Sequence, residues 1–499
     1  MSAPQTCLSL ADGSKVRLGS VLAKAGEGTI YRLADRADIA AKVFHRDLVG
    51  LHEKLAKVTA MAGTVPEGAV QTDGFVVLAW PQKVLHSGGA PVGFVMPRIN
   101  TAQAVEIHSL SNPSNRANPL PTAPQWPAEA TWAHLVTAAA NLCLAVDVVH
   151  HVDAVIGDFQ ERNILVSNTV RVTLVDCDSM QFTGPDGRQY LSPLGRPEFT
   201  APELAKVDLR HTARDKTSDL FALGLHIHLL IMAGNHPFLR GIWTGAGDQP
   251  DALTLAHQGN WAGGPGSLLL THPLAPPANF LPNEIQELFT RAFTLGARDP
   301  GARPTADEWR QALSRIQIIS CARQPRHQIP AGTDICPWCD IEAARNARKT
   351  AGRSARLEQT IMPALGQQLS PPMATAASAP ASVSSGGSSN RLLLWGLLVL
   401  LVVVGVTAVL SNVLPGDNQT ATPSHGVTTT SRHPPIPKGD WRTTPIVEFP
   451  SGLPAPRQLW KMTIAGTCDE GGSCGLNNAT PPIRRQIDWS LPTCRTDTR

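Results

Sequence analysis

The sequence predicts an α+β fold with two lobes over residues 12–318, followed by a series of smaller segments. Two observations predict this arrangement. Short apolar runs alternate with helical patterns throughout residues 12–318, and this range is long enough to bury two connected cores. The remaining residues change composition several times, which agrees with the several domains expected of a chain of 499 residues.

Charge and composition limit the classes of function. The formal net charge is only +3, so nucleic acid is not expected as a partner. The 42 prolines and 41 glycines, together with an aromatic content of 5%, indicate long irregular stretches outside a folded core.

Near the start of the chain, a segment with two glycines precedes an apolar run that contains a lysine. The segment is LAKAGEGTIYRL, which contains Gly26 and Gly28. The run is IAAKVF, an expected strand in which Lys42 follows the apolar residues 39–41. A short helix is expected in LHEKLAKVTAMAG, and it includes Glu53.

The C-terminal lobe is expected to contain two long helices. Residues 132–152 have an amphipathic pattern, and residues 219–232 are almost entirely apolar. The second helix has about 14 residues, too few to cross a bilayer, so it is predicted to be buried in the lobe. His226 and His228 within it are expected to be structural.

Three polar residues between these helices have a spacing suited to phosphoryl transfer, in IGDFQERNILVSNTVRVTLVDCD. Asp158 is followed by Asn163 and later by Asp176, with an alternating apolar run from Ile164 to Val175 that predicts a β-hairpin. The hairpin brings the three side chains to one end. One carboxylate can orient an attacking hydroxyl, while Asn163 and Asp176 offer the oxygen ligands that Mg²⁺ prefers when it bridges ATP phosphates.

These stretches resemble, in order, motifs of the eukaryotic-like protein kinases over roughly the first 315 residues. LAKAGEGTIYRL resembles the glycine-rich loop, and TAPEL resembles the end of the activation segment. SDLFALG resembles the start of the large buried helix of the C-terminal lobe. Arg303 stands where the family carries the arginine that pairs with the activation-segment glutamate, which is Glu203 here.

The resemblance implies a two-lobed protein-kinase-like fold and assigns roles to individual residues. Asp158 is the implied catalytic base, and Asn163 and Asp176 are the implied Mg²⁺ ligands. Lys42 is the implied lysine for the ATP phosphates, with Glu53 as its expected partner. The other positions expected at the nucleotide are Ala23, Ala25, Gly26, Gly28 and Ile30.

The chain also departs from the family pattern. Ala23 and Ala25 occupy the first two glycine positions of the loop, where a Cβ restricts the approach of the backbone to phosphate. Gly157 replaces an arginine that reads a phosphorylated activation segment in many relatives, so activation by phosphorylation of that segment is not expected. Gln160 replaces a common lysine. Cys177 and Asp178 replace the usual Phe and Gly of the metal segment, as in a bacterial subgroup of these kinases that often carries a C-terminal zinc ribbon.

Residues 319–342 are predicted to form such a zinc ribbon. CARQPRHQIPAGTDICPWC brings Cys321, His327, Cys336 and Cys339 into one short segment, and tetrahedral Zn²⁺ accepts a set of three cysteines and one histidine. With all four ligands from the protein, the zinc would be structural. The alternatives are a redox pair in CPWC, or two unrelated buried thiols.

The rest of the chain is predicted to tether the lobes to a membrane. Residues 343–390 are expected to form a basic helix and a flexible linker, and residues 391–411 a single transmembrane helix. Its apolar stretch, Leu392 to Leu410, would span about 28 Å as a helix. The kinase-like part is expected in the cytoplasm. Residues 412–499, a Pro/Thr-rich stalk and a small region with cysteines, are expected outside the cell membrane.

The leading functional hypothesis is a membrane-anchored protein kinase that transfers the γ-phosphoryl group of ATP to serine or threonine hydroxyls of protein substrates. Its expected cofactors are ATP, Mg²⁺ and a structural Zn²⁺. One alternative is a pseudokinase or scaffold that binds nucleotide or partner proteins, which Ala23, Ala25 and Gln160 favour. Another is a small-molecule phosphotransferase, against which the Glu203–Arg303 motif argues.

Overall fold

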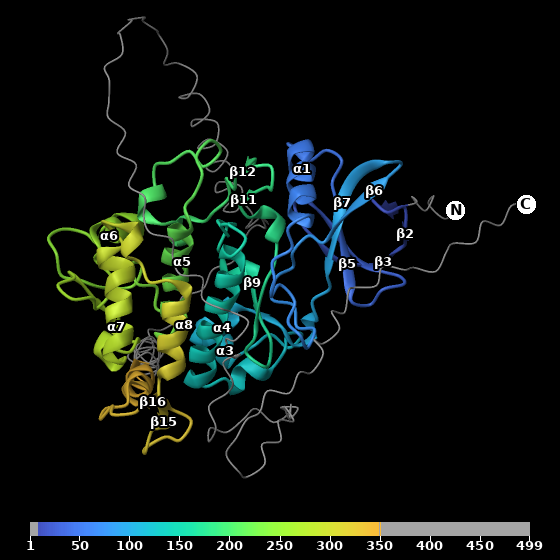
Figure 1. Cartoon of the computed structure of the whole chain (residues 1–499). Helices are drawn as coiled ribbons and strands as arrows, with labels where there is room; N and C mark the ends of the chain where they lie inside the picture. The colour runs from blue at the N-terminus through green and yellow to red at the C-terminus, as the bar shows by residue number, and fades with distance from the viewer. Residues whose placement is uncertain (1–7, 349, 351–499) are drawn as a thin grey trace, which may run out of the picture. The chain divides into compact units, whose positions relative to one another are not determined.

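The computed structural model describes residues 8–348 and 350, which include an N-terminal sheet with one helix and a helical C-terminal region (Figure 1). The sheet has the strand order β2-β1-β6-β7-β5-β4-β3, and all its neighbouring strands are antiparallel. The strands are β1 (Leu8–Leu10), β2 (Lys15–Val16), β3 (Leu18–Lys24), β4 (Gly28–Leu33), β5 (Ile39–Phe44), β6 (Lys83–Ser87) and β7 (Ala90–Pro97). β1 lies before the predicted start of the domain at residue 12 and pairs with β6.

Strand β5 is buried on both faces because its side chains alternate between two apolar clusters. Ala40 and Phe44 belong to the main core, whereas Ile39 and Ala41 belong to a smaller core on the other face of the sheet. Lys42 therefore points to the same face as Ala40 and Phe44. This is the face that helix α1 (Leu51–Ala62) covers, in contact with β6 and β7.

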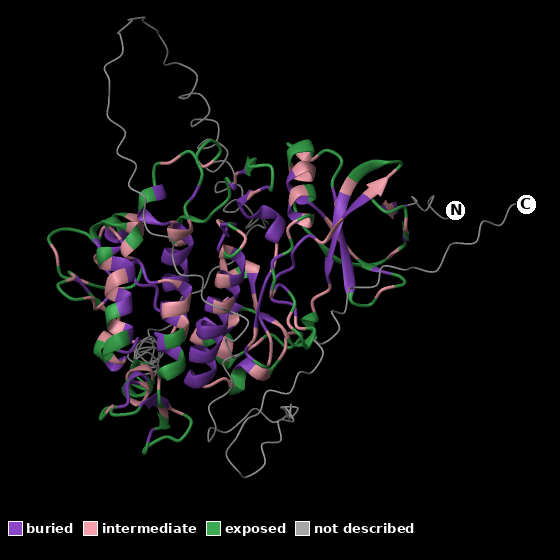
Figure 2. Ribbon diagram, in the orientation of Figure 1, coloured by how far each residue is buried: buried purple, intermediate pink, exposed green. Residues whose placement is uncertain are grey.

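The C-terminal region is built around two buried helices. α4 (Trp132–His150) packs against α5 (Lys216–Ile231) and α8 (Ala306–Arg315), and Figure 2 shows buried residues concentrated along α4 and α5. Both helices were predicted. α5 begins three residues before the expected position because the Asp215 side chain accepts a hydrogen bond from the Thr217 N–H and caps it. The other helices are α2 (Ile107–Ser111), α3 (Pro113–Ala117), α6 (Ala252–Gln258) and α7 (Asn283–Phe289).

The predicted β-hairpin is confirmed. β9 (Ile164–Val166) and β10 (Val172–Leu174) are antiparallel, with Val172 opposite Val166. Val170, which the apolar pattern places in a strand, lies instead in the turn with φ of 55°. β8 (Val105–Glu106) extends this small sheet, and three further strand pairs are β11 (Phe182–Thr183) with β12 (Gln189–Tyr190), β13 (Gly241–Trp243) with β14 (Leu269–Thr271), and β15 (Ile318–Ser320) with β16 (Gln328–Pro330).

The predicted ribbon packs on the C-terminal lobe. β15 and β16 form a hairpin that is followed by a helix over residues 337–348. Gln328 is buried, and its side-chain oxygen accepts a hydrogen bond from the N–H of Ala133 in α4. The Trp338 ring meets Phe280 edge to face, with ring centroids 5.4 Å apart. The ribbon and α4 therefore share one apolar core.

Of the predicted basic helix and linker over residues 343–390, residues 343–348 are helical, and the part from residue 351 lies outside the described residues. The predicted transmembrane helix and extracytoplasmic region also lie outside them. Within residues 8–348, α4 is long and apolar enough to cross a bilayer, but 89% of its most apolar window is buried in the core. This is the pattern of a core helix, so α4 is weak evidence for a membrane span.

Candidate active site

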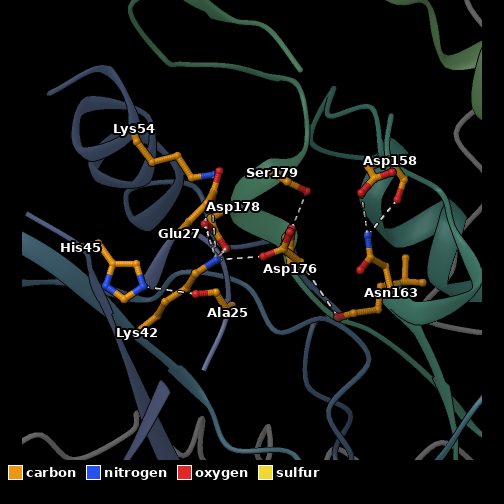
Figure 3. Close-up of polar contacts among 12 residues, drawn as sticks. Ala25, Glu27, Lys42, His45, Lys54, Asp158, Asn163, Asp176, Asp178 and Ser179 are labelled. Carbon is orange, nitrogen blue, oxygen red and sulfur yellow. Dashed lines mark hydrogen bonds and ion pairs between the residues drawn. The ribbon is translucent and has the colours of Figure 1, made fainter. Parts of the chain in front are cut away.

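Lys42 lies at the centre of a charged cluster between the sheet and the C-terminal lobe (Figure 3). Its side chain is 3% exposed, and Nζ donates to Asp176 Oδ1 at 2.8 Å and to the two oxygens of Asp178 at 2.9 and 2.8 Å. Burial opposes the charge of Lys42, but the two carboxylates outweigh it and raise the pKa of this lysine above its usual value. Lys42 is therefore a buried cation held by two acids that follow β10.

The segment after β10 turns sharply at Asp176. This residue has φ of 56°, in the left-handed region, and the 3₁₀ turn η4 (Cys177–Ser179) follows directly. The Ser179 backbone N–H and hydroxyl both donate to the Asp176 carbonyl, at 2.9 and 2.7 Å. The turn buries Cys177 in the core and leaves the carboxylates of Asp176 and Asp178 directed at Lys42.

The loop before β9 holds Asp158 and Asn163 together. Asn163 Nδ2 donates to the backbone oxygen of Asp158 at 2.9 Å and to its Oδ2 at 3.2 Å. Gln160 Nε2 also donates to Asp158 Oδ2, at 2.6 Å. The backbone oxygen of Asn163 accepts from the N–H of Val175, which ties this loop to the residue before Asp176. Asp158 is thus oriented by two amide groups.

The surroundings of Gly157 explain why this position carries a glycine instead of the family arginine. Its φ is 71°, and a Cβ at this position would lie 3.0 Å from Ser192 Oγ and 3.4 Å from Arg214 Nε. Arg214 is buried and donates to the carbonyls of Ser192 and Leu194 in the segment before TAPEL. A buried arginine from elsewhere in the chain therefore binds the backbone of this segment.

The predicted pairing of Arg303 with Glu203 is confirmed. Arg303 donates two parallel hydrogen bonds of 2.7 Å to the carboxylate of Glu203, and further bonds to the carbonyls of Thr217 and Gly296. The pair joins η6 (Pro202–Leu204) to the start of α5.

The β3–β4 turn is closely packed at Gly28 and open at Gly26. The Ala25 N–H donates to the Gly28 carbonyl at 2.9 Å, and a Cβ on Gly28 would lie only 2.4 Å from the Val43 carbonyl of β5. Gly28 is thus required by the approach of two strands, whereas nothing lies within 4 Å of a Cβ at Gly26. Ala23 lies opposite Ile30 in the β3–β4 ladder.

The prediction that Glu53 pairs with Lys42 is wrong. Glu53 is exposed on α1, and the partners of Lys42 come from the segment after β10. Glu53 and Lys54 are neighbours in sequence, but successive residues of a helix point about 100° apart. Lys54 is the one that faces the site, so the helix presents a lysine where an acid was expected.

Three acids around Lys42 have the arrangement of a cation site. Carboxylate oxygens of Glu27, Asp176 and Asp178 lie within 4.8 Å of one another. Asn163, the other predicted Mg²⁺ ligand, donates to Asp158 through Nδ2. A metal would be bound by its Oδ1, so this role of Asn163 stays a prediction. Glu27 and Lys54 were not among the site residues predicted from the sequence. The signals available were an acid in the turn between β3 and β4, and the acid pair at positions 176 and 178.

The four predicted zinc ligands come together in the ribbon. Cys321 Sγ is 3.8 Å from Cys339 Sγ, and His327 Nδ1 lies 3.4 Å from Cys339 Sγ and 3.7 Å from Cys336 Sγ. With bonds of about 2.3 Å to sulfur and 2.0 Å to nitrogen, tetrahedral Zn²⁺ sets its sulfurs about 3.8 Å apart and sulfur and nitrogen about 3.5 Å apart. The other ring nitrogen of His327 lies 3.1 Å from Glu342, as expected of a metal-bound histidine. The donor set fits zinc.

Comparisons with known proteins find relatives that are named protein kinases. The chain is 30% identical over 345 residues to protein kinase YegI of Escherichia coli O157:H7 and 29% identical over 337 residues to protein kinase YegI of Escherichia coli K12. The chain resembles bacterial protein kinases. Each match covers 66% of this chain, and the chain spans about half the length of these relatives, 50% and 49%.

A shorter similarity extends to a plant protein. Over 91 residues the chain is 33% identical to serine/threonine-protein kinase GRIK1 of Arabidopsis thaliana, a match that covers 18% of this chain and 22% of that protein. No family model matches the chain. The kinase-like fold is therefore supported by curated relatives and by the curled sheet with its helical partner region.

Proposed function

We propose that this chain is a protein kinase that transfers the γ-phosphoryl group of ATP to serine or threonine hydroxyls. The observation that carries the proposal is the meeting of Lys42, from β5, with Asp176, from the segment after β10, at 2.8 Å. A buried lysine and a metal-binding carboxylate brought together from two lobes are the parts that phosphoryl transfer requires. The names of two relatives support protein kinase activity, and the shorter match to a serine/threonine-protein kinase supports these acceptors.

Each residue of the site has a role in this proposal. Bound ATP supplies the phosphoryl group, and Mg²⁺ neutralises charge on the phosphates. Lys42 binds the phosphates, and Asp176 holds the metal. Asp158 orients the acceptor hydroxyl, and the amides of Gln160 and Asn163 keep its carboxylate in one orientation.

Two alternatives make different predictions. A pseudokinase would bind nucleotide without transferring phosphate, which Ala23 and Ala25 in the glycine-rich loop favour. A small-molecule phosphotransferase would label a small acceptor instead of protein. The bidentate Arg303–Glu203 pair supports a protein kinase over a small-molecule phosphotransferase, because this pair is one of the motifs in which the chain resembles protein kinases.

The experiment uses the purified full chain with γ-labelled ATP, Mg²⁺ and either casein or kanamycin as acceptor. Label on serine or threonine of casein, lost in Asp158→Ala and kept in the matched surface variant Asp186→Ala, supports the proposal. Asp186 is exposed in the β11–β12 turn. Nucleotide binding without any label identifies a pseudokinase, and label on kanamycin alone identifies a small-molecule phosphotransferase.

Membrane anchoring and a structural zinc complete the proposal. The apolar stretch 392–410 supports a single-pass protein with the kinase-like lobes in the cytoplasm. The distances among Cys321, His327, Cys336 and Cys339 support a zinc ion that fixes the ribbon against α4. Membrane fractionation of cells that express the chain, with 392–410 deleted as the control, tests the anchor.

A further inference from the structure

Helix α1 presents lysines, not acids, to the site. Its inward face carries Lys54, Lys57, Val58 and Met61, spaced three and four residues apart as one helical face requires. Lys57, Val58 and Met61 are buried, and the Lys54 side chain is 14% exposed. Glu53 lies off this face and is exposed. Lys42 therefore receives no carboxylate from α1.

The carboxylate comes from Asp178 instead. Its side chain is 2% exposed, and both of its oxygens lie within 2.9 Å of Lys42 Nζ. Burial would raise the pKa of Asp178, but Lys42 and Lys54 hold that pKa below its usual value. Asp178 is thus a buried, charged partner of Lys42, and it lies two residues from Asp176 on the same turn.

Lys54 joins this pair to the β3–β4 turn. Its Nζ lies 3.3 Å from Asp178 Oδ2 and 2.5 Å from Glu27 Oε2. Glu27 also lies 3.8 Å from Lys42 Nζ, and the N–H of His45, which follows β5, donates to the Glu27 carbonyl. One chain of charges therefore connects the β3–β4 turn, helix α1 and the segment after β10 (Figure 3).

We propose that Asp178 is the positioning residue of Lys42, in place of a glutamate from α1, and that Lys54 secures Asp178 directly while Glu27 of the β3–β4 turn holds Lys54. The inference rests on the proposed function, because it names the residue that prepares Lys42 for phosphate. It also has a mechanical consequence. The phosphate lysine and the metal carboxylate are both set by residues 176–178, so movement of α1 alone does not separate Lys42 from its acid.

The loss of Asp178 has a defined physical effect. Without it, Lys42 keeps Asp176 as its carboxylate partner at hydrogen-bonding distance. Asp176 is then drawn to the lysine and is less available to a divalent cation. The ammonium groups of Lys42 and Lys54 also lose the buried carboxylate that they share. Their mutual repulsion is then less well compensated, which disfavours the present positions of both side chains. Asp178→Asn should therefore weaken nucleotide binding and raise the Mg²⁺ concentration needed for half-maximal binding.

A charge exchange distinguishes positioning from a general structural role. The Nζ atoms of Lys42 and Lys54 lie next to the same oxygen of Asp178, at 2.8 and 3.3 Å. A glutamate at position 54 can therefore bring a carboxylate toward Lys42 from α1. If Asp178 acts by giving Lys42 a carboxylate, Lys54→Glu should restore part of what Asp178→Asn removes.

The experiment compares the full-length wild type, Asp178→Asn, Lys54→Glu, the double variant, and Asp47→Asn as a matched control. Asp47 is an exposed acid between β5 and α1. A fluorescent ATP analogue with Mg²⁺ reports affinity, KM and kcat for ATP report transfer, and thermal melting reports folding. We expect at least tenfold weaker binding in Asp178→Asn, no change in Asp47→Asn, and at least a threefold recovery in the double variant.

Two results would overturn the inference. One is Asp178→Asn with an affinity for ATP and a Mg²⁺ requirement within twofold of the wild type. The other is a double variant that melts like the single variant but binds nucleotide no better. Failure of the proposed function has a different signature, because a wild type that binds ATP without transferring phosphate leaves the affinity comparison intact.

Discussion

The guanidinium group of Arg303 is fully buried and donates a hydrogen bond of 2.7 Å to each carboxylate oxygen of Glu203, which lies 100 positions away in the sequence. Removing one partner of a buried ion pair leaves the other charge uncompensated and destabilises by about 3–5 kcal/mol. Because Glu203 is 30% exposed, we expect a smaller loss for Glu203→Gln, about 2 kcal/mol in the free energy of unfolding.

Urea denaturation measures this loss. Glu284→Gln is the matched control, because Glu284 pairs with Arg315 at the surface, where both side chains are about half exposed. It should change the free energy of unfolding by less than about 1 kcal/mol. Equal effects of the two substitutions would show that burial of Arg303 does not set the strength of its pair.

Arg214 is expected to hold the segment around residue 194 in place. Arg214→Lys keeps the charge but loses the planar fork that reaches the carbonyls of Ser192 and Leu194. Hydrogen exchange in residues 190–200 should become faster, while exchange in α4 stays unchanged. Unchanged exchange in residues 190–200 would mean that other contacts hold this segment.

Removal of zinc should loosen the ribbon. The full chain should contain about one equivalent of zinc, and Cys336→Ser with Cys339→Ser should lose it. Trp338, which packs on Phe280, should then become accessible to fluorescence quenchers. Cys143→Ala is the control, because Cys143 is a buried free cysteine of α4 and is not one of the four proposed zinc ligands. A metal-free wild type, purified without chelators under reducing conditions, would favour the redox-pair alternative.

Lys57 predicts a pH dependence of stability. Burial, with a smaller effect from Lys54, lowers the pKa of Lys57 from 10.5 to about 7, although Asp178 and Glu27 oppose the shift. Between these two values the unfolded chain binds a proton that the folded chain lacks, so stability contributed by this residue rises with pH across that window. Below about pH 7 Lys57 is charged in both the folded and the unfolded chain, and the full cost of burying its ammonium group lowers the stability of the fold.

The variant Lys57→Met should therefore be more stable than the wild type at pH 6, and this advantage should shrink as the pH rises toward 10. The advantage at pH 6 should be on the order of a few kcal/mol, since one pKa unit corresponds to about 1.4 kcal/mol. Urea denaturation at both pH values measures it. A constant difference between the two proteins would show that Lys57 does not titrate in this window.

Local patterns predicted the elements that hold the site. Apolar alternation predicted the β9–β10 hairpin, helical periodicity predicted α4 and α5, and the order of motifs predicted the Arg303–Glu203 pair. Each of these predictions depends on residues that are neighbours in the sequence, or on a family motif whose partner residue is known. The pairing of Lys42 with Asp178 could not be found in this way, because Asp178 lies 136 positions away and takes the place of a family glycine.

The orientation of helix α1 explains why the predicted pairing of Glu53 with Lys42 is wrong. A shift of one residue along α1 exchanges exposed Glu53 for inward-facing Lys54, and sequence alone does not determine which of the two faces β6 and β7. Arg214 was missed for a related reason. Its contacts to Ser192 and Leu194 depend on how two irregular segments pack, and such segments have no periodicity that sequence analysis can use.

Phosphoryl transfer by Asp176→Asn in the full chain tests the proposed active site most directly. Asp176 joins Lys42 to the proposed metal site, and the amide keeps its size but removes the negative charge. We expect kcat for labelling of casein to fall at least a thousandfold, with the melting temperature little changed and Asp186→Asn as active as the wild type. Transfer by a folded Asp176→Asn at the wild-type rate would contradict the proposed active site.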